Sequence, residues 1–386
     1  MQIPPFCPNP DCAFHRPETI PHGALFWIRA GTYTAKVSGI VQRFLCAACG
    51  KGFSERSCSI DYYVKKSLDY REIHRATISS ESLTSIARHL SCSVASIQNR
   101  QDRLGRNCLA MQARLLANHA LIEDLCADGF ESFDRSQYFP NALNLLIGDG
   151  SQFLYGSSHA TLRRKGRMTA SQKRKQAEYD ARFAPPKGGL TRSFSRLVAQ
   201  IEPLWTRRSR PRLVLRTDEH PVYPKALARV PTLRAALEDR SFIHETYSSK
   251  IPRTPANPLF PVNYYDRELR KDIAAFRRES TCFTRNVANG LLRFTHHMVW
   301  HNYFKPHRIV STSVKPESHA IVAGIEGKRI ERETKRLYSE RAFLSHQKLN
   351  DEQRRIWLKR HPTPLKDKMD YCPRYARAGD LQASKN

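Results

Sequence analysis

The chain has 386 residues, an apolar share of 40% and a formal net charge of +28, with 64 Lys and Arg against 36 Asp and Glu. This excess of positive charge favours a polyanionic partner, nucleic acid above all; a basic protein without such a partner is the alternative. No apolar run reaches the roughly 20 residues that span a bilayer, and the first residues lack the pattern of a signal peptide. We therefore expect a cytoplasmic protein, associated with the nucleoid if its source is bacterial.

Residues 1–60 predict a small zinc ribbon. Four cysteines in this segment form two close pairs, which in an intracellular protein favours metal binding over disulfides. They are Cys7, Cys12, Cys46 and Cys49. Strand-like runs at 24–28 and 39–45 separate the pairs, and two such turns can offer four thiolates to one tetrahedral Zn²⁺. Because the first pair is more widely spaced than usual, His15 and Cys58 stand as substitute ligands; buried free thiols are the alternative.

Residues 61–120 predict a helix-turn-helix. Ser82 can cap a helix over 83–90, residues 91–93 form the break, and Ser93 can cap a second helix. The second helix would present polar side chains that pair with base edges in a major groove. These side chains are Gln98, Asn99, Arg100 and Arg103. An ordinary helical hairpin that packs only on its neighbours is the alternative.

Residues 121–310 predict an α/β domain. A helix is expected at 224–238 and another from 262 onward. Apolar runs of the kind that form strands lie before the first helix and between the two. The strand-like runs are 125–130, 142–148, 153–156, 212–218 and 242–246. Three strands followed by strand–helix–strand–helix fit a mixed sheet flanked by helices, of the ribonuclease H type.

Two aspartates mark the ends of strand-like runs in this domain. Asp128 interrupts the first run and Asp218 closes the fourth. Carboxylates that meet from distant parts of a chain can hold two divalent cations and promote phosphoryl transfer. A third acidic stretch, 262–268, lies at the start of the expected long helix. For each aspartate, a turn or cap residue is the alternative interpretation.

The order of these motifs resembles that of bacterial insertion-sequence transposases of the Asp-Asp-Glu class with an N-terminal zinc ribbon and helix-turn-helix. Besides the helix-turn-helix and Asp128, the segments that carry the resemblance are 46–53, 217–219, 276–283 and 301–308. The resemblance spans residues 1–310. It implies a ribonuclease H-like catalytic domain that cleaves DNA and transfers strands at insertion-sequence ends. It also implies Mg²⁺ (or Mn²⁺) at Asp128 and Asp218, structural Zn²⁺, and a homodimer or larger assembly on transposon-end and target double-stranded DNA.

The third catalytic position departs from the family pattern. The family has Glu near the start of a helix, where the best match here is Asp266, 266 − 218 = 48 positions after Asp218. Asn263 ranks second and Glu268 third, while Glu279 fits better as an ion-pair partner further along. A DNA-binding regulator without catalytic activity is the alternative function, and a nuclease acting on RNA or branched DNA is a third.

Two basic segments complete the sequence. Residues 163–210 predict loop and helix near a nucleic-acid backbone, with a solvated charged face as the alternative. Residues 311–386 predict a basic helical tail, with alternating charges over 326–336 and a helix that starts at Asn350 or Asp351. The tail would embrace DNA or a second subunit, or extend into solvent. Since the chain has no Gly-rich phosphate loop ending in Lys-Ser or Lys-Thr, we expect no ATP dependence.

Overall fold

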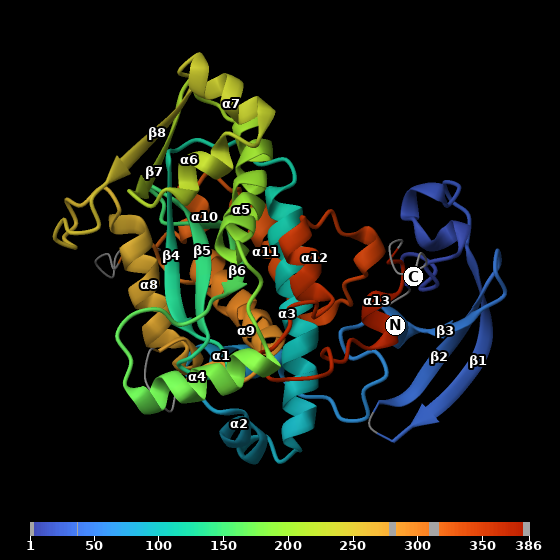
Figure 1. The fold of residues 1–386 in the computed structure, drawn as a ribbon. Coiled ribbons are helices and arrows are strands. Elements are labelled where there is room, and N and C mark those ends of the chain that lie inside the picture. Colours follow the sequence, from blue (N-terminus) through green and yellow to red (C-terminus); the bar gives the residue numbers. More distant parts are fainter. Residues whose placement is uncertain (1–3, 37, 278–282, 309–315, 381–386) are drawn as a thin grey trace.

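The structure, a computed structural model, describes residues 4–36, 38–277, 283–308 and 316–380. Its N-terminal module, residues 4–58, contains a three-stranded antiparallel sheet at one side of the molecule (Figure 1). The strands are β1 (Trp27–Ala35), β2 (Gly39–Cys46) and β3 (Gly52–Ser54). A small apolar cluster around Phe26 and Phe44 packs beside the cysteines, so the module has almost no core of its own.

The centre of the molecule is a mixed five-stranded sheet in the order β6-β5-β4-β7-β8. The strands are β4 (Leu125–Phe133), β5 (Pro140–Gly148), β6 (Leu154–Thr161), β7 (Leu213–Asp218) and β8 (Phe242–Tyr247). The first three form an antiparallel meander, whereas β7 and β8 run parallel to β4. Because β7 joins the free edge of β4, residues that are 90 positions apart in sequence, such as Leu125 and Leu215, lie side by side.

Helices cover the sheet and connect its parallel strands. Helix α5 (Gly189–Thr206) packs on β5 and β6, and α8 (Phe260–Asp272) packs on β4 and β5. The helix expected at 224–238 is two helices, α6 (Val222–Leu227) and α7 (Pro231–Glu238). Pro231 at the first position of α7 disfavours helical geometry at Val230, which is extended, and this separates the two. The predicted mixed sheet flanked by helices is confirmed.

Three helices precede the sheet: α1 (Tyr70–Ile78), α2 (Leu83–His89) and α3 (Val94–Leu116). Ser82 and Ser93 cap α2 and α3 as expected, each accepting a backbone hydrogen bond through its hydroxyl oxygen. Helix α3 continues far beyond the turn, and its second half packs against α9 (Val287–Val299) in the main core. The two helices approach closely at Gly105, where a Cβ atom would lie 3.0 Å from Leu292.

Residues 316–380 contribute to the main core. Trp357 of α12 is fully buried, and its indole nitrogen donates a hydrogen bond to the carbonyl of Ala376. The helices of this part are α10 (His319–Val322), α11 (Gly327–Ser339), α12 (Asp351–Trp357) and α13 (Arg374–Arg377). The alternative of a solvated appendage is therefore wrong for the described residues of this tail, 316–380. Core packing crosses the expected boundaries at 120 and 310, since apolar side chains on both sides share one cluster.

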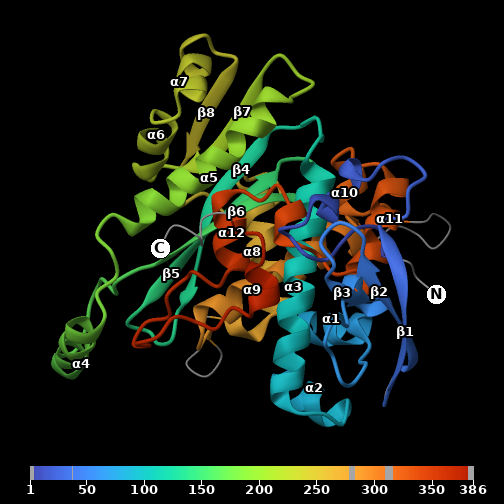
Figure 2. The same ribbon diagram turned by 90° about the vertical axis from the view of Figure 1, so that its right-hand side faces the viewer.

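Helix α4 (Ala170–Arg182) stands apart from the sheet on a long connection between β6 and α5, as Figure 2 shows. Shorter helical segments complete the fold. They are η1 (Ala13–His15), η2 (Pro17–Thr19), η3 (Glu55–Cys58), η4 (Ala274–Phe276), the π-helix η5 (Trp300–Phe304) and η6 (Leu344–His346). Within the described ranges, no helix combines the length and apolar character needed to cross a membrane.

Candidate functional site

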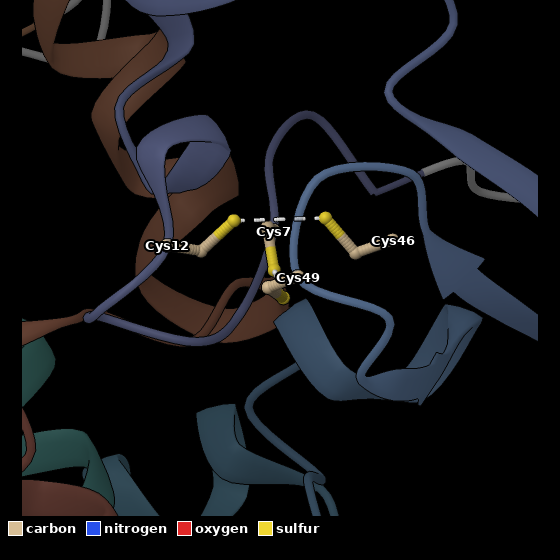
Figure 3. Close-up of side chains that lie close together, drawn as sticks. All are labelled: Cys7, Cys12, Cys46 and Cys49. Carbon is tan, nitrogen blue, oxygen red and sulfur yellow. Dashed lines mark hydrogen bonds between the residues drawn. The ribbon is translucent and has the colours of Figure 1, made fainter.

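The four predicted cysteine ligands come together in the N-terminal module (Figure 3). Their sulfur atoms all lie within 4.8 Å of one another. The Sγ–Sγ distance is 3.7 Å between Cys7 and Cys49, and 3.6 Å between Cys12 and Cys46. A tetrahedral zinc ion with Zn–S bonds of ~2.3 Å would require sulfur atoms about 3.8 Å apart. The cluster therefore has the dimensions of a site for a structural metal such as zinc.

Local backbone geometry explains the second pair of ligands. Gly50 has a φ of +66°, which favours glycine, and its amide donates to the carbonyl of Cys46, closing the turn. Burial raises the pKa of the Cys49 thiol, but a hydrogen bond from the Lys51 amide and the neighbouring thiols outweigh it and lower the pKa to about 7. This thiol is thus ready to ionise and bind a cation.

The two substitute ligands lie outside the cluster. His15 is buried, and its Nδ1 lies 2.7 Å from the carbonyl oxygen of Cys7, while its Nε2 lies 2.6 Å from Ser345 Oγ. His15 therefore orients a ligand residue and does not replace one. Cys58 lines a separate cavity. The wide spacing of the first cysteine pair is compatible with a four-cysteine site because the chain turns between the two cysteines, and the amide of Cys12 donates to the carbonyl of Asn9.

The two predicted aspartates lie on neighbouring parallel strands. Leu125 of β4 pairs with Leu215 of β7, so Asp128 and Asp218 are each three residues beyond this pair. Asp218 is the last residue of β7, whereas β4 continues for five residues past Asp128. The hydroxyl of Tyr223 on α6 donates to Asp128 Oδ1 at 3.4 Å and also interacts with Asp218. The structure therefore brings both carboxylates to one place.

The charges of the two carboxylates influence each other. Burial raises the pKa of Asp128 to about 6, the negative charge of Asp218 adds to this, and a hydrogen bond from the amide of Gly129 opposes it. The pKa of Tyr223 lies far above its usual value because of burial and the two adjacent carboxylates. A buried carboxyl with a raised pKa beside a second carboxylate favours binding of a cation, which would relieve their repulsion.

We expect Asp128→Asn to stabilise the metal-free protein at pH 7.5 by about 1–2 kcal/mol, since ionising a half-buried carboxyl with a raised pKa costs free energy. The pKa of Asp128 is higher in the folded protein than in the unfolded chain, so the neutral carboxyl favours the folded state. This contribution to stability is fully present below about pH 4. It is lost as the pH rises through about 6. Urea unfolding at pH 4 and pH 7.5 measures the difference.

At pH 7.5, Mg²⁺ should raise the melting temperature of the wild-type protein but not that of the variant. A variant that gains equally from Mg²⁺ would contradict the assignment.

Helix α8 runs beside β4 in the same direction. Near its start, Cys126 Sγ lies 3.4 Å from the carbonyl oxygen of Pro258. Near its end, the guanidinium of Arg270 lies 4.5 Å from the centre of the Phe130 ring. Side chains alternate along a strand, so Asp128 points to the same side as Cys126 and Phe130. Asp128 therefore faces the middle of α8.

Helical spacing identifies the α8 residues on this side. Asn263 and Asp266 precede Arg270 by seven and four positions, so they share its face of the helix. These are the first two choices for the third catalytic position, and both are half-buried. In the part of the chain that the structure describes, no trio of carboxylates that includes Asp128 and Asp218 brings its ligand atoms within 4.8 Å of one another. The third position stays open between Asp266 and Asn263.

Glu268, the third choice, has another role. It is buried and forms ion pairs with Lys271, at 2.5 Å, and with Lys305. These ammonium groups lower the pKa of Glu268 although burial opposes the shift. Glu268 thus joins α8 to the end of η5 and is engaged away from the aspartates. Glu279 lies outside the described residues.

The expected recognition helix differs from the prediction at two arginines. Arg100 and Arg103 are only 6% and 8% exposed. Arg100 donates to the carbonyl of Lys66, and Arg103 donates to that of Ile60 and lies over the ring of Tyr375. Both side chains hold neighbouring segments in place, so neither reaches a DNA groove in this structure. The prediction failed because it did not include the packing of residues 60–68 and of α13 onto α3.

The other two predicted DNA-binding residues are half-buried. Gln98 donates to Asp102 Oδ1, and Asn99 Oδ1 accepts hydrogen bonds from both arginines. The exposed part of α3 is its first turn, which includes Val94 and Ala95. A DNA contact by this helix would therefore involve its N-terminus.

Sequence reasoning missed Tyr223, which contacts both aspartates. The one hint of this contact in the sequence is that Tyr223 lies five residues after Asp218, at the start of α6. It also missed Arg270, which fixes α8 on β4 through the Phe130 ring. A stacking contact between two distant segments has no signature in the sequence.

A scan against protein-family models gave no match to this chain. A search of curated proteins also gave no match.

Proposed function

We propose that the protein is a DNA transposase that cleaves DNA strands and joins them to a new site with the help of divalent metal ions. The observation that carries this proposal is the pair Asp128 and Asp218, which lie on adjacent parallel strands, with the negative charge of Asp218 adding to the raised pKa of Asp128. Such a pair can hold Mg²⁺ or Mn²⁺. The strong positive charge of the chain makes a nucleic acid the natural substrate.

The topology of the sheet supports a ribonuclease H-like catalytic domain. Three antiparallel strands are followed by two strands parallel to the first, in the order β6-β5-β4-β7-β8. The carboxylates lie on the first and fourth strands of this domain, and α8 follows the fifth. This is the arrangement that the resemblance to Asp-Asp-Glu transposases implies.

The residues of the chain supply position and charge for the reaction. Asp128 and Asp218 would hold the ions, with Asp266 or Asn263 on α8 completing one ion's shell. When bound, paired ions activate the attacking oxygen and stabilise the leaving oxygen of a phosphodiester. The hydroxyl of Tyr223 donates to Asp128 and also interacts with Asp218, so it would help to position the two carboxylates. Arg270, fixed over Phe130, places a cation near the same strand, where charge develops on the phosphate.

Helix α4 and its flanking loops supply a surface for the DNA backbone. Gln176 is the one buried residue that α4 has, so the helix faces solvent on nearly every side. Most of the charged side chains in this arm are cations. They are Arg163, Arg164, Lys165, Arg167, Lys173, Arg174, Lys175, Arg182 and Lys187. Ion pairs engage Arg163 and Lys175, and the others support phosphate contacts.

The direct test is metal-dependent DNA chemistry. Purified protein should cut duplexes taken from the two sides of its own coding sequence when Mg²⁺ or Mn²⁺ is present, and join the ends to a plasmid. One observation favours a second function, a non-catalytic DNA-binding regulator: in the described residues no third carboxylate completes the pair. Tight duplex binding without any cleavage in either metal would support the regulator and contradict the transposase.

Asp266 ranks first for the third position, and substitution separates it from Asn263. We expect Asp266→Asn to slow Mg²⁺-dependent cleavage about 100-fold, because an ion with an incomplete shell stabilises the transition state less well. Mn²⁺ should restore part of the rate. Asn263→Ala is the matched variant one turn earlier on the same face, and it should keep cleavage within about threefold. The reverse result would assign the position to Asn263.

A further inference from the structure

A cavity of about 510 Å³ lies where the N-terminal module meets the C-terminal part of the chain. One wall comes from residues of the module, including Phe6, Arg16 and Glu18. The opposite wall comes from the end of α11 and residues 341–348, and α3 contributes the floor. This volume lies within the range of roughly 300–1,000 Å³ that is usual for small-molecule sites.

Direct hydrogen bonds hold the two walls together. His15 Nε2 lies 2.6 Å from Ser345 Oγ, and the amide of Arg341 donates to the carbonyl of Cys58 at 2.7 Å. His346 Nε2 lies 3.0 Å from the carbonyl oxygen of His15. The cavity is therefore formed before any ligand enters, which reduces the ordering cost of binding.

Positive charge converges on this cavity. Five cationic side chains and two carboxylates line it. They are Arg16, Arg114, Arg336, Arg341 and Lys348, with Glu18 and Glu340. Glu333 and Glu340 form ion pairs with Arg114 and Arg336. The other charged residues that line the cavity are three cations, Arg16, Arg341 and Lys348, and one carboxylate, Glu18.

Those three cations come from both walls: Arg16 belongs to the N-terminal module, and Arg341 and Lys348 belong to the opposite wall. Among the described residues, Arg16, Arg341 and Lys348 have no carboxylate within ion-pair distance. Arg341 donates to the carbonyls of Ser57 and Tyr375, and its guanidinium lies over the rings of Tyr62 and Phe343, so it holds this wall in place and adds its charge to the cavity. Gathering cations around a cavity costs free energy, which a bound anion would recover.

Aromatic rings form the apolar part of the cavity. The Phe6 ring lies 5.2 Å from that of Phe343 and 4.4 Å from that of His346, in edge-to-face contacts. Burial and the neighbouring His15 lower the pKa of His346 to about 4, so this ring is neutral at pH 7. Phe343 is only 2% exposed, so a nucleoside base can pack against the half-buried rings of Phe6 and His346. An inorganic anion would use the cations but not these rings.

We propose that this cavity binds one phosphate-bearing nucleotide, with the phosphate at Arg16 and Lys348 and the base at Phe6 and His346. Two sources share this chemistry, a free nucleotide and the terminal nucleotide of a DNA strand. Because the occupant touches both walls, it fixes the N-terminal module against the rest of the chain. This site is separate from the aspartates and does not depend on the proposed catalytic function.

Calorimetry on the full-length, zinc-loaded protein tests the site with deoxyadenosine monophosphate as the probe. The nucleotide should bind more tightly than inorganic phosphate or deoxyadenosine. The double variant Arg16→Ala/Lys348→Ala, at two exposed positions, should weaken its binding at least about tenfold, or ~1.4 kcal/mol. The control variant Lys225→Ala/Arg234→Ala removes two exposed cations from α6 and α7 and should bind as the wild-type protein does.

A second comparison distinguishes the sources. A single-stranded oligonucleotide with a 5′-phosphate is compared with its 5′-hydroxyl form at a salt concentration that suppresses backbone binding. Tighter binding of the phosphorylated form, lost in the double variant, assigns a strand end. Equal binding of both forms, with the mononucleotide still bound, assigns a free nucleotide. The proposal is overturned if the mononucleotide does not bind, binds no better than phosphate, or binds the double variant unchanged.

Discussion

Asp218→Asn is expected to reduce metal-dependent DNA cleavage at least about 10³-fold, which corresponds to ~4 kcal/mol of lost transition-state stabilisation. Asp218 ends β7 beside Asp128, and its charge contributes to the raised pKa of that neighbour. An amide at this position removes the charge that holds a divalent ion while it keeps the shape of the side chain. The measurement is single-turnover cleavage of a labelled duplex in Mg²⁺.

Glu219→Gln is the matched control for this experiment. Glu219 is the next residue, is exposed, and loses the same charge in the variant. Cleavage by Glu219→Gln should stay within about twofold of wild type, because an exposed carboxylate outside the site affects the reaction only through screened charge. Duplex binding, measured by gel shift at fixed salt, should be unchanged in both variants. If Asp218→Asn cleaved at the wild-type rate, the metal mechanism proposed here would be wrong.

Cys46→Ser is expected to unfold the N-terminal module. The module buries few apolar side chains, so the free energy of metal binding, about 10–16 kcal/mol for a structural zinc site, would supply most of its stability. The variant should lose its bound zinc, and limited proteolysis should cut within residues 4–58. The main core contains the sheet and the C-terminal helices, so it should still unfold cooperatively.

Cys58→Ser is the control that shows whether the effect of Cys46→Ser comes from losing a metal ligand or from losing any cysteine. Cys58 lies in η3 and outside the cluster of four sulfur atoms. This variant should keep one zinc per chain, measured by metal analysis, and resist proteolysis within the module. Zinc retained by Cys46→Ser, or lost by Cys58→Ser, would show that the ligand set differs from the four cysteines.

The cysteine cluster and the strands of the five-stranded sheet could be predicted because their signals are local. The two residues of each cysteine pair are close in sequence, and the turn of the second pair starts at Cys46, the last residue of β2. Likewise Asp128 and Asp218 lie within apolar runs that form buried strands. Short spacing and alternation directly reflect backbone geometry, so a single sequence is enough to read them.

The helices were harder to assign because a helix exposes different faces to different neighbours. The pattern of α3 predicted a recognition helix, yet Arg100 and Arg103 are buried against residues 60–68 and α13. Packing likewise distinguishes the three α8 candidates for the third catalytic position, Asp266, Asn263 and Glu268. Arg270 over Phe130 turns Asn263 and Asp266 toward β4, while Lys305 binds Glu268 on another side.

The sequence by itself determined the charge of the protein, the cysteine cluster, the order of strands and the two aspartates. Only the tertiary structure decided that the C-terminal helices join the core, that Tyr223 contacts both aspartates, and that cations converge on a cavity beside the N-terminal module. The physical reason is that these contacts join residues from distant segments. Periodicity specifies which face of an element is apolar, but burial against a particular partner depends on how every other element packs.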